Sequence, residues 1–68
     1  MSSIYFFLHK STVNGQWYFN VRSTGNHHVV ATSEGYHNKQ DAIRTINVIR
    51  GGAATASIYD DSVKQWAA

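Results

Sequence analysis

The stretch GQWYFNVRSTGNHHVVATSEGYHNKQDAIRTINVIR, residues 15–50, contains the change of hydrophobic period that decides the fold. At its start, Trp17, Phe19 and Val21 alternate with residues that face the other way, as in a strand. Towards its end the apolar residues follow one stripe of a helix. These residues are Ala42, Ile43, Ile46, Val48 and Ile49. A strand is therefore predicted at the start of this stretch and a helix at its end.

Two further strands are predicted around the first one. Residues 4–9 alternate two sets of β-forming side chains. An Asn-Gly pair ending at Gly15 marks a hairpin loop between this strand and the strand over residues 16–23. Residues 24–26, Thr-Gly-Asn, predict the turn into a third, shorter strand over residues 28–32. We expect these three strands to form an antiparallel sheet.

The rest of the chain supplies one helix and one more strand. The helix is expected to begin after Asn38, a residue type that caps helices, and to stop at the glycine pair 51–52. Residues 55–59 form a short β-like run. The predicted fold class is α+β, with an antiparallel sheet of three strands plus a short fourth strand and one helix on one face (βββαβ). We expect one domain over residues 1–61 and a short C-terminal tail over residues 62–68.

A single helix covers only one face of such a sheet, and we place it on the more apolar face. That face is formed by Ile4, Phe6, Leu8, Trp17, Phe19 and Val21. The opposite face carries three aromatic side chains beside an amide and a guanidinium, and exposed patches of this kind mark interaction surfaces. Together with a tryptophan of the tail, they form the predicted interface: Tyr5, Phe7, Tyr18, Asn20, Arg22 and Trp66.

These segments resemble, in the same order, the YegP-like family of small bacterial proteins. Residues 15–36 are similar to the family's aromatic strand, Asn-containing turn and valine-rich strand, and residues 39–50 are similar to its helix. Residues 55–62 are similar to its short closing strand. A Ser-x-x-Tyr-x-x-Lys pattern leads into the helix, here as Ser33, Tyr36 and Lys39.

The resemblance covers residues 4–61 and implies a βββαβ unit. Such units occur as tandem repeats in one chain or as a lone copy that pairs with another. The resemblance brings no catalytic residue, since the biochemical role of the family is uncharacterised. This chain departs from the pattern at Phe7, where a charged or polar residue is expected. It also has Thr45 and Val48 where smaller helix residues are usual, which leaves the packing angle of the helix open.

Size and composition favour an assembly of two copies. A chain of 68 residues buries only about 60% of its unfolded surface, so its core is marginal. Small domains usually add disulfides, a metal or an oligomeric partner. The chain has no cysteine, which excludes disulfides and thiolate metal sites. A homodimer is therefore the predicted state, with a protein partner as a further possibility.

The first ten residues, MSSIYFFLHK, have no basic leader and only a short apolar run. We therefore expect a cytoplasmic protein without membrane contact. The six basic residues give a formal net charge of +2 and are scattered along the chain. A nucleic-acid partner is not favoured, because such binding needs basic residues gathered on one face.

No residue pattern predicts catalysis, a metal or a cofactor. The four histidines lack the spacing of zinc ligands: His9, His27, His28 and His37. The acidic pair Asp60 and Asp61 is predicted to form a solvated turn. The sequence has neither a phosphate-binding glycine loop nor a nucleophile elbow. We therefore expect no enzymatic activity and no cofactor.

The leading hypothesis is a small non-enzymatic binding or structural module that acts as a homodimer. Two alternatives remain open. The first is a protein-directed inhibitor or adaptor from a phage or other mobile element. The small size of the chain and its exposed aromatic face would suit this role. The second is a weak binder of single-stranded nucleic acid, in which Tyr5, Phe7, Tyr18 and Arg22 would supply stacking and charge.

Overall fold

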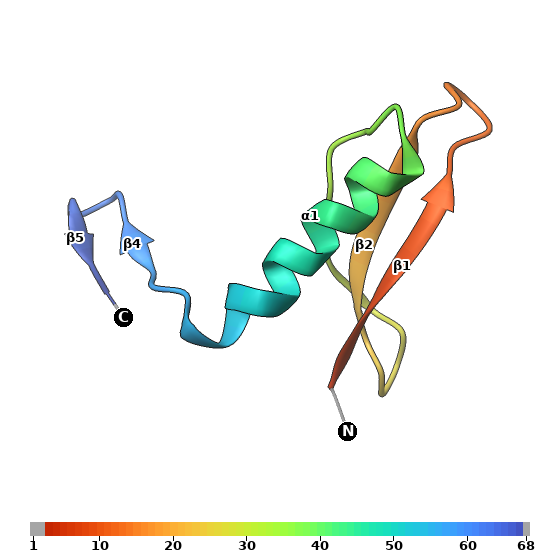
Figure 1. Ribbon diagram of the computed structural model, residues 1–68. Helices are drawn as coiled ribbons and strands as arrows, with labels where there is room; N and C mark the ends of the chain where they lie inside the picture. The colour runs from red at the N-terminus through yellow and green to blue at the C-terminus, as the bar shows by residue number, and fades with distance from the viewer. Residues whose placement is uncertain (1–2, 68) are drawn as a thin grey trace.

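The computed structural model describes residues 3–67 (Figure 1). Its elements are β1 (Ile4–Lys10), β2 (Trp17–Ser23), β3 (Val29–Thr32), α1 (Lys39–Gly52), the 3₁₀ turn η1 (Ala53–Thr55), β4 (Tyr59–Asp60) and β5 (Gln65–Trp66). The first three strands form one antiparallel sheet in the order β1-β2-β3, and β4 and β5 form a second, two-stranded sheet. The α+β class is confirmed. No helix in the described part of the chain is long and apolar enough to cross a membrane.

The pairing of β1 with β2 fixes which side chains share a face. Phe6 stands opposite Val21, and the neighbouring pair on the other face is Phe7 with Asn20. The hairpin loop before β2 contains Gly15 with φ of 72°, as the Asn-Gly pair predicts. β3 carries a bulge, because the register shifts where it pairs with β2. Bulges of this kind increase the local twist of an edge strand.

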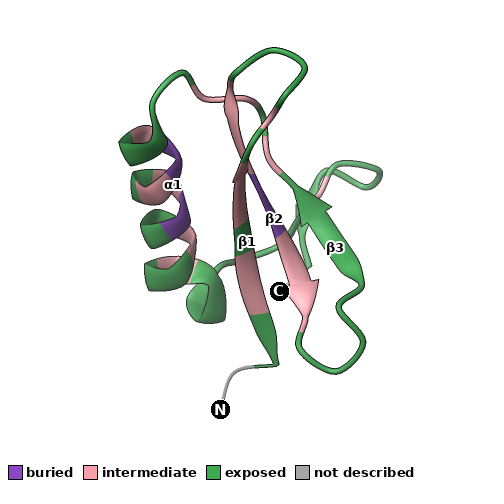
Figure 2. Cartoon of the chain, turned by 90° about the vertical axis from the view of Figure 1, so that its right-hand side faces the viewer, coloured by how far each residue is buried: buried purple, intermediate pink, exposed green. Residues whose placement is uncertain are grey.

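Helix α1 covers the predicted face of the sheet. Figure 2 shows its buried side turned towards β2. The core consists of Phe19, Ala42 and Ile46, which are 5%, 0% and 9% exposed. Partly buried side chains pack around it: Phe6, Leu8, Trp17, Tyr36 and Ile49. The placement of the helix is confirmed, and the core it forms is small.

Both ends of α1 lie where the sequence predicts them, but their capping differs from the expected one. Asn38 precedes the helix as expected, but its side-chain amide donates to the Asp41 carboxylate at 3.3 Å and does not cap the backbone. The helix ends at the predicted glycine pair, with Gly52 as its last residue. The N–H of Ala53 still donates to the carbonyl of Ile49, and neither glycine takes a positive φ. The chain therefore continues outwards and does not reverse at the glycines.

Residues 53–66 leave the body of the molecule, and we call them the C-terminal arm (Figure 1, blue end). The fourth strand, expected over residues 55–59, begins at Tyr59, because residues 53–55 form the 3₁₀ turn. It pairs with β5 and not with the larger sheet. The β4–β5 hairpin therefore extends past residue 61, where the sequence predicted the domain to end. The radius of gyration is 14.1 Å, whereas a compact domain of this size has about 11 Å. The arm accounts for this elongation.

The Ser-x-x-Tyr-x-x-Lys pattern holds the connection between β3 and α1 against the middle strand. The hydroxyl of Ser33 accepts a hydrogen bond from the N–H of Phe19 at 2.9 Å. Tyr36 forms a β-bridge with Trp17 and stacks on the ring of Phe19, with ring centres 6.2 Å apart. The ammonium group of Lys39 lies 5.4 Å from the centre of the Trp17 ring. Each residue of the pattern thus contacts β2.

Candidate interaction surfaces

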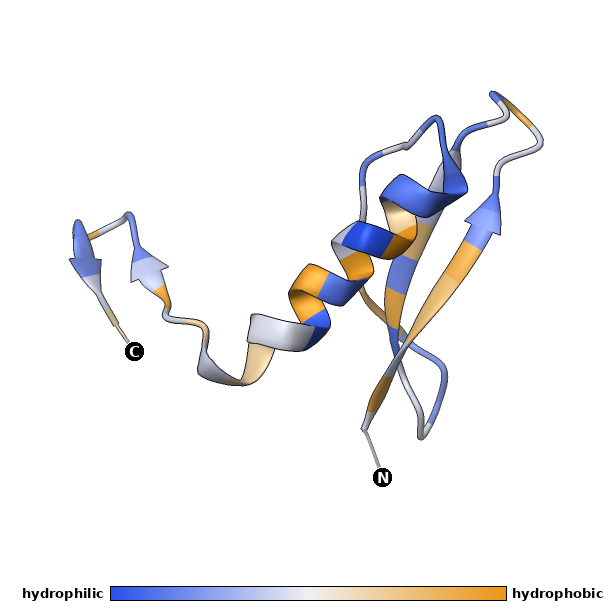
Figure 3. Ribbon diagram, viewed as in Figure 1, coloured by the Kyte–Doolittle hydropathy of each residue, from blue (hydrophilic) through white to orange (hydrophobic). Residues whose placement is uncertain are grey.

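The first surface is a groove between α1 and β1, with a volume of about 680 Å³. We call it the helix groove. Its apolar lining comes from Ile4, Phe6, Leu8, Ile43, Ile46, Ile49, Ala53 and Ala54. Figure 3 shows apolar segments of α1 and β1 facing each other here. β1 is an edge strand, and its outer side pairs with no strand within residues 3–67. An edge of this kind readily accepts a further strand.

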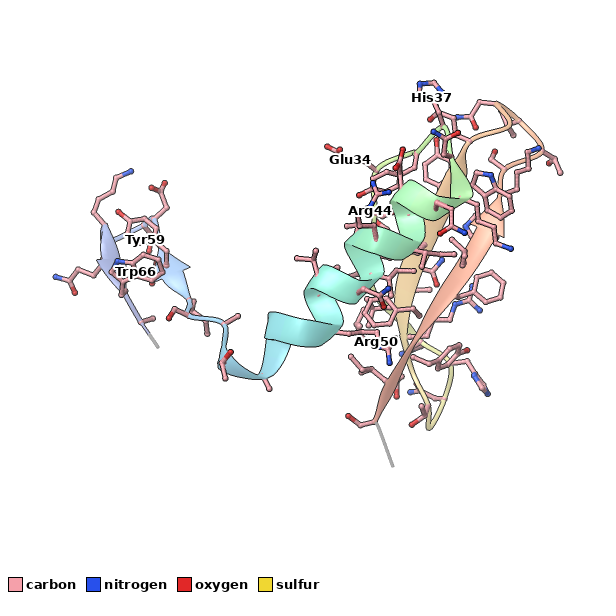
Figure 4. The ribbon with its side chains drawn as sticks, viewed as in Figure 1. Glu34, His37, Arg44, Arg50, Tyr59 and Trp66 are labelled. Carbon is pink, nitrogen blue, oxygen red and sulfur yellow. The ribbon has the colours of Figure 1, made fainter. Side chains whose placement is uncertain are left out.

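The second surface is the C-terminal arm, which exposes four large apolar side chains. They are Ile58 (58% exposed), Tyr59 (48%), Val63 (59%) and Trp66 (70%). The rings of Tyr59 and Trp66 meet edge to face with centres 5.1 Å apart (Figure 4). A two-stranded hairpin alone is at best marginally stable in water. The arm therefore presents apolar surface that the body of the same chain does not cover.

The turn of the arm is polar and locally hydrogen-bonded. Asp60 accepts hydrogen bonds from the hydroxyl of Ser62 at 2.5 Å and from its N–H at 3.0 Å. The bond from the Ser62 hydroxyl is the main reason why the pKa of Asp60 lies below its ordinary value. Asp61 forms an exposed ion pair with Lys64 at 2.6 Å. The acidic pair thus lies in a turn, as the sequence predicts.

The third surface is the face of the sheet away from α1. It gathers five of the six residues that the sequence singles out, and we call it the open face. Its residues are Tyr5, Phe7, His9, Tyr18, Asn20 and Arg22. The guanidinium of Arg22 lies 3.9 Å above the ring centre of Phe7, and its Nε donates to the Asn20 side-chain oxygen at 2.7 Å. The sixth predicted residue, Trp66, lies on the arm.

Two histidines join the open face that were not among its predicted residues. The ring of His9 stacks on Tyr18, with centres 6.0 Å apart, and lies 5.6 Å from Phe7. Strand alternation alone would have placed His9 there. The Nδ1 atom of His27 is 2.8 Å from the Tyr5 hydroxyl. His27 reaches it from a turn in which its φ is 60°, a conformation that no sequence pattern indicates.

Metal-ligating side chains do not gather within residues 3–67. No group of three or more His, Cys, Asp or Glu side chains there is placed to hold a metal ion. His27 belongs to the ring contacts described above, and the N–H of His28 donates to the side-chain oxygen of Asn26 at 3.0 Å.

A family model described as a domain of unknown function, DUF1508, matches residues 13–60. No curated protein and no solved structure matches the chain. The matched residues include β2, β3, α1 and the first strand of the arm, so the arm as far as Asp60 is part of the family's unit. Trp66 lies beyond them. Since the match spans more than half of the sequence, the chain belongs to the DUF1508 family, whose function is unknown.

Proposed function

We propose that this chain is a single-copy member of the YegP-like group and acts as a binding or structural module that homodimerises through its C-terminal arm. In the dimer, the arm of each copy lies in the helix groove of the other. One observation carries the proposal: the same chain has an uncovered apolar groove and an apolar arm that points away from it. The module is proposed to be cytoplasmic and non-enzymatic.

The groove and the arm are chemically complementary. The groove is walled by an edge strand and by the aliphatic side of α1, so a strand added at that edge would place alternate side chains under the helix. Ile58 is the aliphatic arm residue nearest the start of β4. Burying one large apolar side chain contributes about 1.5–3 kcal/mol. A two-fold symmetric dimer makes each such contact twice.

The direction of the chain favours a second copy over the chain's own groove. Ala53 and Ala54 line one end of the groove, and the arm continues outwards from there. The arm would have to reverse its direction after α1 to enter its own groove, and residues 53–55 instead form a 3₁₀ turn that prolongs the helix. A partner related by two-fold symmetry receives the arm without this reversal.

Light scattering of the purified chain at tens of micromolar tests the proposal. The expected mass is twice the chain mass of 7.6 kDa. Ile58→Asp should give a monomer, because it places a charge in the apolar groove. Val13→Asp is the matched control, since Val13 is 93% exposed in the β1–β2 loop and should leave the dimer intact. A monomeric parent chain, or an Ile58→Asp variant that remains dimeric, would overturn the proposal.

A further inference from the structure

The positive charge of the chain is concentrated on the larger sheet. Residues 3–33, which contain β1, β2 and β3, include Lys10 and Arg22 but no Asp or Glu. In the remaining residues, four acidic side chains balance four basic ones. The formal net charge of +2 therefore belongs to the part of the chain that forms the sheet. Of these two basic residues, Arg22 lies on the open face and Lys10, by strand alternation, on the face that α1 covers, and neither has a carboxylate beside it in the sheet.

On the open face the ring of His9 contacts those of Phe7 and Tyr18, and the ring of Tyr5 contacts that of His27. Side chains on one face of a strand repeat about every 6.8 Å, so Tyr5, Phe7 and His9 follow one another along β1. His9 also stacks on Tyr18 of the neighbouring strand, with an angle of 22° between the rings. Phe7 remains 39% exposed. The rings are held by their neighbours and still present surface, which is the arrangement on which bases stack.

Arg22 supplies a fixed positive charge in the middle of these rings. Its guanidinium is stacked on Phe7, and the bond from Nε to Asn20 fixes its orientation. This bond uses Nε, so the two terminal nitrogens are the atoms through which the guanidinium can contact a phosphate. Arginine suits this role because its planar group stacks on aromatic rings and donates to phosphate oxygens at the same time.

From these observations we propose that the open face binds single-stranded nucleic acid. Bases stack on the rings of Tyr5 and Tyr18 and on the Arg22–Phe7 pair, and the terminal nitrogens of Arg22 contact the backbone. The guanidinium favours an anionic partner, and the aromatic rings favour one that also carries planar bases over an acidic peptide. The site lies on the face of the sheet away from α1, and of its residues Tyr5 alone also borders the helix groove, so the site goes beyond the proposed dimer and does not depend on it.

Fluorescence anisotropy with a labelled DNA single strand of about 12 nucleotides, at about 50 mM salt, tests the site. Arg22→Ala should weaken binding at least about fivefold and make the slope of log K against log salt shallower by about 0.7, as for one lost phosphate contact. Phe7→Leu keeps an apolar side chain but removes the ring. It should weaken binding by at least about fivefold while the salt slope stays unchanged.

Arg44→Ala is the matched control, because it removes the same charge from an exposed position on α1 (Figure 4). It should change the affinity less than about twofold, and Ile58→Asp should retain binding even as a monomer. Absence of binding to the DNA strand, or equal losses for Arg44→Ala and Arg22→Ala, overturns the proposal. The proposal is also overturned if Phe7→Leu leaves binding unchanged and an acidic peptide displaces the labelled strand as well as unlabelled DNA does.

Discussion

Phe7 shows how one side chain changes the character of a surface. It stands opposite Asn20 in the sheet register, and the guanidinium of Arg22 lies over its ring. The YegP-like pattern leads us to expect a charged or polar residue at this position. Such a residue would leave the guanidinium without an aromatic face, a contact that contributes about 0.5–1 kcal/mol at exposed sites. Phe7 thus provides the ring of the stacked pair at the centre of the open face.

Among the glycines, Gly35 is the one at which an added Cβ would meet the closest neighbouring atoms. An added Cβ would collide with the side-chain oxygen of Gln16 and lie 2.9 Å from the hydroxyl of Tyr18. The end of Gln16 can move, but the Tyr18 hydroxyl is held by a hydrogen bond from Asn14 at 2.8 Å. We predict that Gly35→Ala lowers the free energy of unfolding by about 1–3 kcal/mol, measured by urea denaturation.

Gly25→Ala provides the comparison for this prediction. The nearest atom to an added Cβ there is the hydroxyl oxygen of Ser23, at 3.8 Å, and the φ of Gly25 is not positive. We expect its free energy of unfolding to change by less than about 0.5 kcal/mol. Equal effects of the two substitutions would show that the contact with Tyr18 does not restrict residue 35.

At the scale of elements, the sequence predicted what local periodicity determines. The alternation in β1 and β2 and the stripe of α1 are local patterns, and each indicated the correct element and the correct face, except at Val48, which the stripe included and which is 72% exposed. The glycine pair 51–52 indicated the correct end of α1, but not that the chain continues into a 3₁₀ turn without a left-handed glycine cap. β4 pairs with β5 across the four-residue turn 61–64, but two residues are too few to show the alternation of a strand. The pairing of β4 with β5 was therefore beyond sequence reasoning.

The candidate surfaces likewise include some that local sequence patterns indicate and some that they do not. Strand alternation places Tyr5, Phe7, Tyr18, Asn20 and Arg22 on one face, so this set followed from the sequence. The helix groove depends on how α1 packs against β1, which no local pattern indicates. The contact of a turn histidine with Tyr5 likewise depends on a left-handed backbone conformation.

The β4–β5 hairpin is expected to respond to acid through Asp60. Hydrogen bonds from Ser62 lower the pKa of this carboxyl below its ordinary value of 3.8. The turn is therefore stabilised at pH values above 3.8 and loses this stabilisation as the pH falls through the lowered pKa. We predict that the amide resonance of Ser62 titrates with a midpoint below 3.8 in an NMR pH series.

Ser62→Ala removes the hydroxyl bond while keeping the backbone bond. The midpoint should then move towards the ordinary value, followed on the amide of residue 62. An unchanged midpoint would mean that the hydroxyl does not stabilise the charged form of Asp60 and that the turn is held by other contacts.

At the scale of the whole molecule, the shape follows from an arm that is not folded onto the body. The molecule measures 40 × 27 × 20 Å, and its apolar groove and apolar arm are both uncovered. The proposed dimer covers both at once and leaves the open face of each copy accessible. Two βββαβ units would then be joined as the tandem repeats of longer YegP-like chains are expected to be.

Disulfide cross-linking between two differently marked chains tests the exchange of arms most directly. The chain has no cysteine, so introduced cysteines report a single contact. Ile43→Cys marks the helix groove on one chain, and Ile58→Cys marks the arm on an isotope-labelled second chain. The two are unfolded together, refolded and oxidised. Our account predicts a covalent dimer with one chain of each kind as the main product. A third chain carries both cysteines. If the mixed covalent dimer is absent and the disulfide closes within this single chain, the exchange of arms is contradicted.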